Sequence, residues 1–275
     1  MDKFSVLIPS YKEKERVFNL VKTILNDKLS KHIDKIIIVS PDKDLILPKS
    51  KKILLIRERK RRGKYFAIRL GLKEIKTKIV VMLSSDIRIR KNFLKYLITH
   101  FKNPKIGMVV GRPIADKNSR IYRFSKIIWD LHHLLCLKEP KGTEICAFRK
   151  IFNYFPKISA DEVFIEYKIR KAGFKIIYEP KAYGYTKTPY SLKHFFSQRK
   201  RSFSGHLQLK KDYNFITSSM KPLLILKSLL SLILKTKSIK VFFDLLILTF
   251  IELLARVSAI IEVFSNKYEI IWRRY

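Results

Sequence analysis

The sequence predicts an α/β domain built on a mainly parallel sheet, followed by an apolar helical segment. Short apolar runs typical of strands alternate with helical patterns over the first two-thirds of the chain. The expected strands lie at 4–10, 35–39, 52–56, 78–83, 106–110, 145–148 and 174–178. The expected helices lie at 14–27, 65–76, 91–102, 120–137 and 161–172. In folds of this kind, ligands bind at the carboxyl ends of the strands.

Three of the expected strands end in an abrupt change from apolar to polar residues. These ends read Pro9-Ser10-Tyr11, Ser40-Pro41-Asp42 and Ser84-Ser85-Asp86. Because parallel strands end at one edge of a sheet, we expect the three to share a crevice. A buried strand that ends in a carboxylate, in a chain this basic, suggests an anion site built around a cation.

The composition is strongly basic. The 275 residues include 59 lysines and arginines against 23 acidic residues, for a net charge of +36. Nucleic acid, an anionic membrane surface and phosphorylated substrates all fit such a field, and charge alone leaves the three open. Cys136 and Cys146 have no disulfide or metal-ligand pattern and are interpreted as reduced core thiols in a cytosolic setting. The first residues run directly into a strand pattern, so we expect no signal peptide.

The composition becomes almost wholly apolar after about residue 220, in runs at 222–234 and 239–264. The first run is too short to span a bilayer, which takes about 20 residues. The second carries four charged residues beyond Lys240: Asp244, Glu252, Arg256 and Glu262. Their cost in a bilayer roughly cancels the apolar gain, and at about 100° per residue they share one third of the helix circumference. We expect membrane association, with a pair of core helices as the alternative.

Two acidic sites are candidates for chemistry. Asp86 alone is most simply a solvated residue or a cap after its strand. Ser159 and Glu162 fit the S-x-x-E capping box, with Asp161 in the first turn of the helix. The functional alternative is that one of these two carboxylates is a general base. By local pattern alone, the cap is favoured.

Basic and histidine-containing stretches allow further readings. The run at 191–205 predicts an amphipathic helix with a solvated basic face, or a diphosphate site at Arg199, Lys200 and Arg201. Nothing precedes Gly63-Lys64 at P-loop spacing, so a Walker-type site is excluded. His132-His133, on an apolar helix, is interpreted as structural.

The order of five motifs is more specific than any one of them. They are "FSVLIPSYKEKERV", "RRGKYFAIRLGL", "LSSDIRI", "SADEVFIEYKIRKAGFKIIYEPKA" and "QRKRSFSG". In this order they resemble the family-2 glycosyltransferases of the GT-A fold, and most closely the membrane polysaccharide-synthase branch. The resemblance covers roughly residues 3 to 210.

The resemblance implies a nucleotide site. Residues Ser10, Tyr11 and Glu13 lie where the family holds the nucleoside. The family's G-K-x-x-A-x-x-x-G segment beside the nucleotide is matched by Gly63, Lys64, Ala67 and Gly71. Asp86 matches the second aspartate of the D-x-D motif, which implies that it binds Mg²⁺ or Mn²⁺.

The resemblance also implies the reacting groups. Glu162 matches the catalytic base, with Asp161 as its neighbour. Gln198 and Arg201 match the Q-x-x-R-W motif near the donor diphosphate and the acceptor channel. The chain departs from the family pattern at Lys12, Ser40, Ser84 and Ser202. Ser84 replaces the first aspartate of D-x-D, so metal binding is expected to depend on Asp86 and the donor phosphates.

Together these residues imply an inverting glycosyl transfer from a nucleotide-diphospho-sugar, expected to be a UDP-sugar, to a saccharide or lipid-linked acceptor. The expected organisation is a GT-A catalytic domain at 1–215 and a membrane-associated helical hairpin within 216–275. The expected location is the cytoplasmic face of the cell membrane. One alternative is a polyprenyl-phosphate acceptor; another is an inactive protein that binds nucleic acid or an anionic surface. Nucleic acid is not the expected partner, because the sheet lacks dense aromatic and basic interleaving.

Overall fold

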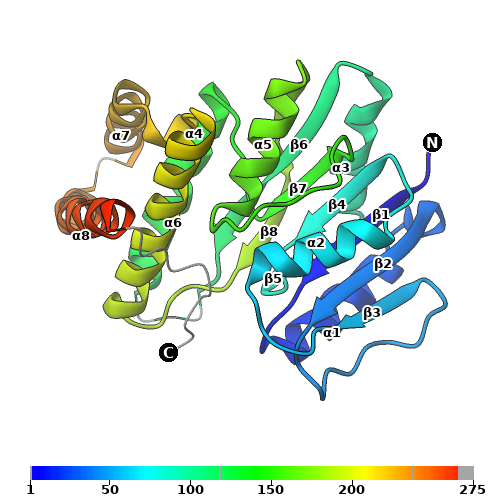
Figure 1. Ribbon diagram of the computed structural model, residues 1–275. Helices are drawn as coiled ribbons and strands as arrows, with labels where there is room; N and C mark the ends of the chain where they lie inside the picture. Colours follow the sequence, from blue (N-terminus) through cyan, green and yellow to red (C-terminus); the bar gives the residue numbers. More distant parts are fainter. Residues whose placement is uncertain (1, 118, 120, 237, 266–275) are drawn as a thin grey trace.

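The computed structural model describes residues 2–117, 119, 121–236 and 238–265. Within that part of the chain, eight strands form one sheet in the order β3-β2-β1-β4-β7-β6-β8-β5 (Figure 1). Their bounds are β1 Phe4–Pro9, β2 Ile33–Ser40, β3 Ile53–Arg57, β4 Ile79–Leu83, β5 Ile87–Ile89, β6 Ile106–Ala115, β7 Ile145–Arg149 and β8 Lys175–Thr186. All seven predicted strands are confirmed, and the short β5 was not predicted.

The sheet is mixed and mainly parallel, as expected, with four parallel and three antiparallel pairings of the described strands. Strands β3, β2, β1 and β4 run parallel to one another, as expected. Strand β7 is antiparallel to both of its neighbours, β4 and β6, while β8 is parallel to β6 and antiparallel to β5. The amino end of β7 therefore lies beside the carboxyl end of β4, at the edge where the polar strand ends meet.

The helices flank this sheet. Their bounds are α1 Lys14–Leu25, α2 Lys64–Glu74, α3 Leu94–Ile98, α4 Tyr122–Lys138, α5 Asp161–Lys171, α6 Leu192–Tyr213, α7 Pro222–Thr236 and α8 Ile239–Phe264. The five predicted helices are confirmed, although the one expected at 91–102 is shared by α3 and a 3₁₀ turn at Thr99–Lys102.

Helices cover both faces of the sheet. Side chains of successive strand residues point to opposite faces, so Val6 packs towards α1 and α3 while Leu7 packs towards α2 and α5. Burial on both faces explains why the parallel strands read as continuous apolar runs. Cys136 and Cys146 are buried free thiols, as expected.

The two C-terminal helices pack mainly on the domain and only slightly on each other. Helix α7 lies along α4 and α8 along α6, whereas α7 and α8 touch only slightly (Figure 1). A third apolar cluster joins them to the domain, through Phe124, Phe195, Leu232, Leu245 and Leu248. The expected helical hairpin is therefore wrong, because each helix buries its apolar stripe against a different helix.

The charged residues of α8 share one face, as predicted, and that face meets the domain. Glu252 forms an ion pair with Arg199, and Glu262 Oε2 accepts a hydrogen bond from Ser204 Oγ at 2.8 Å. Asp244 lies 3.4 Å from Arg123. The outward face is apolar and exposed, at Phe242, Phe243, Leu246, Ile247, Phe250, Leu253, Leu254, Val257 and Ile261. Among the described residues, we find no helix with both the length and the apolar character that crossing a membrane requires.

We expect Glu252→Gln to lower the free energy of unfolding by about 1–3 kcal/mol, because it leaves the partly buried Arg199 without its counter-charge. Urea denaturation measures the change. The control is Glu139→Gln, which removes a more exposed pair with Lys221 and should cost less than about 1 kcal/mol. Equal losses in the two variants would show that the Arg199 pair does not anchor α8.

Candidate active site

A cavity of about 710 Å³ lies at the carboxyl ends of β1 and β4. Its walls include the strand ends, the first residues of α2 and α5, and one side of α6. It continues between α4, α6, α7 and α8. The strand ends that were expected to share a crevice therefore do so.

Lys64 connects three parts of this cavity. Gly63, with φ at 105°, permits the turn by which the chain enters α2, and Lys64 is the first residue of that helix. The Lys64 ammonium donates a hydrogen bond to Glu162 Oε1. It also lies 3.4 Å from Ser84 Oγ and 3.8 Å from Asp161 Oδ2. Lys64, predicted to bind the nucleotide, is thus also the cation shared by the two predicted catalytic carboxylates.

The capping-box interpretation of Ser159 and Glu162 is wrong. Helix α5 begins at Asp161, its N-cap is Ala160, and no side chain caps it. The Glu162 side chain forms an ion pair with Lys64 across the cavity. Gly142 packs against this first turn so closely that a Cβ there would lie 2.2 Å from the Glu162 carbonyl oxygen.

The two carboxylates have different proton affinities. Burial raises the pKa of Asp161 to about 7 against the lowering effect of Lys64, and the charge of Glu162 adds to the rise. Burial also opposes ionisation of Glu162, but the charge of Lys64 and its hydrogen bond lower the pKa of that group. Since the two groups interact, the pair loses its protons in two steps, and the apparent pKa values of those steps belong to the pair. Near neutral pH the pair can both hold and release a proton, as acid–base catalysis requires.

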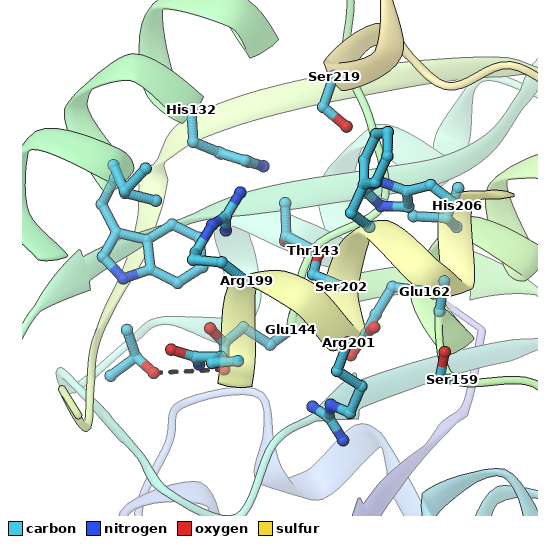
Figure 2. Close-up of a pocket in the computed structure, with 18 of the residues that line it drawn as sticks. His132, Thr143, Glu144, Ser159, Glu162, Arg199, Arg201, Ser202, His206 and Ser219 are labelled. Atoms are coloured by element: carbon cyan, nitrogen blue, oxygen red, sulfur yellow. Dashed lines mark hydrogen bonds between the residues drawn. The ribbon is translucent and has the colours of Figure 1, made fainter. Parts of the chain in front are cut away.

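Asp86 faces a second carboxylate that sequence reasoning did not find. Glu144 immediately precedes β7, and the antiparallel pairing of β7 with β4 places it beside the end of β4. The Thr186 hydroxyl donates to Glu144 Oε2 at 3.3 Å (Figure 2). Burial, followed by the charge of Asp86, raises the pKa of Glu144 to about 8.

These two carboxylates fit a divalent cation held jointly with a diphosphate. Their mutual repulsion, seen in the raised pKa of Glu144, is what a cation would neutralise. Mg²⁺ is commonly bound by one or two carboxylates together with substrate phosphates. In the described part of the chain, no cluster of three or more His, Cys, Asp or Glu residues is arranged to hold a metal alone. The donor phosphates would therefore have to supply further ligands.

The residues predicted to hold the nucleoside lie at the mouth of the cavity, with one exception. Ser10 and Tyr11 line it, and the Arg61 guanidinium lies 3.9 Å from the centroid of the Tyr11 ring. Glu13 is buried and does not line the cavity. It accepts a hydrogen bond at 3.1 Å from Lys187, which does line it. A contact of Glu13 with the nucleoside would thus be indirect.

Helix α6 contributes the remaining predicted residues. Gln198 and Arg201 both line the cavity, and the charge of Arg201 helps to lower the pKa values of Asp161 and Glu162. Arg199 and Lys200, the other candidates for the diphosphate, form ion pairs with α8. Of the basic run, Arg201 is therefore the residue that faces the carboxylate pair.

Comparison with known proteins agrees with this arrangement. The family model described as glycosyl transferase family 2 matches residues 5–161, more than half of the chain. The chain belongs to this family. A poly-beta-1,6-N-acetyl-D-glucosamine synthase of Staphylococcus aureus (strain COL) is 25% identical over 251 residues, which cover 82% of this chain and 60% of the synthase. The chain thus spans less than two-thirds of the length of these curated relatives.

Solved structures share the GT-A fold. A mannosyltransferase from Pyrobaculum calidifontis, in complex with GDP-Man and Mn²⁺, matches with a TM-score of 0.61 and 16% identity, covering 96% of this chain and 88% of its own. A glucosyl-3-phosphoglycerate synthase from Mycobacterium tuberculosis, in complex with Mn²⁺, UDP-glucose and glycerol 3-phosphate, matches with a TM-score of 0.55 and 15% identity. That match covers 75% of this chain and 79% of the synthase chain.

In this family-2 domain, Lys141, Glu144 and His132 are among the cavity-lining residues that sequence reasoning did not predict. Of the histidine pair interpreted as structural, His133 lies 2.7 Å from the Tyr178 hydroxyl, whereas His132 faces the cavity (Figure 2). Lys141 and Glu144 could have been predicted as site residues from their position just before the predicted strand at 145–148. Using that position required the order of strands in the sheet, which a single sequence does not contain.

We expect Lys64→Gln to move the acid limb of the pH profile of kcat/KM, which reports the free enzyme, to higher pH by about one unit or more. An adjacent cation favours the ionised carboxylates, so its removal raises the apparent pKa of the Asp161–Glu162 pair. Nucleoside diphosphate release from a nucleotide-sugar, measured between pH 5 and 9, reports the limb. Lys14→Gln, which removes an exposed pair with Asp44, is the control and should leave the profile in place. An unchanged acid limb in Lys64→Gln would show that Lys64 does not set the apparent pKa of the carboxylates that react.

Proposed function

We propose that this chain catalyses inverting transfer of a sugar from a nucleotide-diphospho-sugar to a saccharide or lipid-linked acceptor. The observation that carries the proposal is the meeting of Lys64, Asp161 and Glu162 in the cavity that Asp86 and Glu144 also border. Such a transfer needs two parts. One is a pair of carboxylates that can act as a general base, and the other is a site for a cation-bound diphosphate. Membership of glycosyl transferase family 2 supports the same reaction class.

The proposed reaction follows from these positions. The donor diphosphate lies at the ends of β1 and β4, near Lys64 and Arg201. Glu162 accepts the proton of the acceptor hydroxyl, whose oxygen attacks the anomeric carbon on the side opposite the diphosphate. The bond between that carbon and the diphosphate oxygen breaks, and the nucleoside diphosphate leaves with the electron pair. Mg²⁺ or Mn²⁺, when held by Asp86 and Glu144, supplies positive charge to the leaving diphosphate.

Lys64 has two anionic partners in this scheme. In the structure its ammonium pairs with Glu162 and lowers the pKa of that carboxyl. A diphosphate bound beside Ser84 would compete for the same ammonium. Release of Glu162 from Lys64 would raise its pKa, and hence its basicity, only when a donor is present.

The proposed donor can be tested with a small set of nucleotide-sugars. A UDP-sugar is the first donor to test, and a GDP-sugar the second, because the two solved relatives bind UDP-glucose and GDP-Man. The curated relatives are synthases of a β-1,6-linked N-acetylglucosamine polymer, so UDP-N-acetylglucosamine belongs in the same screen. A protein that releases nucleoside diphosphate from none of these donors, with Mn²⁺ present, would not be the proposed enzyme.

We further propose that residues 216–275 hold the catalytic domain, 1–215, on the cytoplasmic face of a membrane. The support is the outward face of α7 and α8, where large apolar side chains are exposed while the charges of α8 face the domain. Lys221, Lys235 and Lys240 flank these helices, and each lysine near an anionic leaflet contributes about 1 kcal/mol. Lys237, a further expected flanking lysine, lies outside the described residues.

We expect Glu162→Gln to lower turnover by roughly 10²–10⁴-fold, because glutamine cannot take a proton from the acceptor. Donor affinity and melting temperature should change little, since glutamine keeps the size of the side chain and Asp161 remains as a counter-charge for Lys64. Glu74→Gln, at an exposed position at the end of α2, is the control. Wild-type turnover in Glu162→Gln would remove Glu162 as the base, and Asp161 would be tested next.

We expect the full chain to float with liposomes that contain anionic lipid, and high salt to release only part of it. Replacing two exposed side chains of α8, in Phe243→Asp/Phe250→Asp, should abolish flotation. Tyr154→Asp, at a similarly exposed aromatic outside the C-terminal helices, should not. A full chain that is monodisperse without detergent and ignores liposomes would contradict the proposed membrane association.

A further inference from the structure

Beyond the carboxylates, the cavity continues as an apolar compartment between the C-terminal helices and α4 and α6. Side chains of α4, α6, α7 and α8 form its walls, among them Ile128, Trp129, Phe195, Leu229 and Leu248. The sugar, ribose and diphosphate of a nucleotide-sugar are polar, so these walls match them poorly. An apolar compartment continuous with a reaction site is instead suited to an apolar part of a substrate.

A buried cation lies within this compartment. The Lys141 side chain is only 8% exposed, and its ammonium donates a hydrogen bond to Ser219 Oγ at 2.9 Å. Lys141 has no carboxylate of the described residues within ion-pairing distance. The charges of Glu166 and Glu162 reach Lys141 only from a distance. A buried ammonium without a directly paired carboxylate is costly, and it favours binding of an anion from outside the chain.

Other hydrogen-bonding groups surround the same space. His132, His206 and Ser219 come from three separate elements and lie around the region that Lys141 also lines (Figure 2). Burial and the charge of Lys141 lower the pKa values of both histidines, so at neutral pH they are uncharged hydrogen-bonding groups. One ammonium with several neutral donors is a suitable setting for phosphate oxygens.

The compartment reaches the outer surface between α7 and α8. Leu226 of α7 and Leu253 of α8 line the cavity, yet they are 53% and 58% exposed. The two helices touch only slightly, because each packs on a different helix of the domain. The opening therefore lies on the apolar face that we propose to contact the membrane.

We propose that this compartment binds an amphiphilic acceptor, a lipid whose phosphate or diphosphate head lies at Lys141 and Ser219 and whose alkyl chain follows the apolar walls. The inference rests on the proposed glycosyl transfer and names the chemical class of its acceptor. Free phosphate would leave the apolar walls unused, and a bare saccharide would leave both the walls and the Lys141 ammonium unused. Entry between α7 and α8 would bring the head from the membrane surface to the carboxylate pair.

Binding to the full chain can be followed through Trp129, which lines the compartment, after Trp272→Phe removes the other tryptophan. The probes are geranylgeranyl phosphate, the alcohol geranylgeraniol and the five-carbon isopentenyl phosphate. We expect geranylgeranyl phosphate to bind at least about tenfold more tightly than either of the others. Equal affinity for the alcohol would overturn the phosphate site, and equal affinity for the short phosphate would overturn the chain site.

Two variants test the phosphate site and the alkyl-chain site, each against a matched control. Lys141→Gln should weaken geranylgeranyl phosphate binding by about tenfold or more, whereas Lys221→Gln, outside the cavity on the same side, should change it less than twofold. Leu226→Asp, at the exposed opening, should weaken it similarly, whereas Leu223→Asp, exposed on the same helix but not lining the cavity, should not. Because Leu226 is exposed, its variant keeps the test valid even if Lys141→Gln unfolds.

Calorimetry with UDP-sugars, GDP-Man and Mn²⁺ separates this inference from the proposed function. Donor binding without lipid-phosphate binding would overturn the acceptor class alone. Lipid-phosphate binding without binding of any donor would overturn the proposed function, and with it the role of the lipid as acceptor. Labelled sugar can be offered with geranylgeranyl phosphate or with a lipid diphosphate that already carries a sugar. The compound that becomes labelled is the acceptor that the enzyme uses.

Discussion

The active-site cavity depends on one buried interaction, the contact of Lys64 with Asp161 and Glu162. Lys64 and Glu162 are 98 residues apart in the chain, and they meet where the starts of α2 and α5 approach the end of β4. Adjacent carboxylates as buried as these would repel each other without a cation between them. The Lys64 ammonium therefore fixes the position of α5 relative to the parallel half of the sheet and keeps Glu162 ionised.

The sheet topology supplies the second constraint. Strand β7 enters the sheet antiparallel to β4, so the residues before β7 lie beside the residues after β4. This brings Glu144 to Asp86, and Lys141 to the compartment behind the carboxylates. One connection thus contributes to both the proposed donor site and the proposed acceptor site. Such an arrangement would allow the proposed cation to be held by two carboxylates although Ser84 replaces the first D-x-D aspartate.

The sequence predicted most elements and only part of the site, for physical reasons. Apolar runs report burial, so the strands ending at Pro9 and Leu83 were predictable from local pattern. The order of strands is set by long-range pairing, so Glu144 was not. The Ser159–Glu162 capping box failed because a local pattern cannot register a lysine from another helix. The charged stripe of α8 was predicted from helical periodicity. Its partners Arg199 and Lys200 were interpreted as part of a solvated face or a diphosphate site, because α6 was considered alone.

The central claim is that Asp86 and Glu144 hold a divalent cation against the donor diphosphate beside Lys64. Its most direct test is a crystal structure of the full chain with UDP and Mn²⁺, with the metal located by its anomalous scattering. The account predicts one Mn²⁺ about 2.1 Å from carboxylate oxygens of both Asp86 and Glu144, and in contact with the diphosphate. A diphosphate bound in the cavity with Mn²⁺ absent, or with Mn²⁺ bound away from both carboxylates, would contradict it.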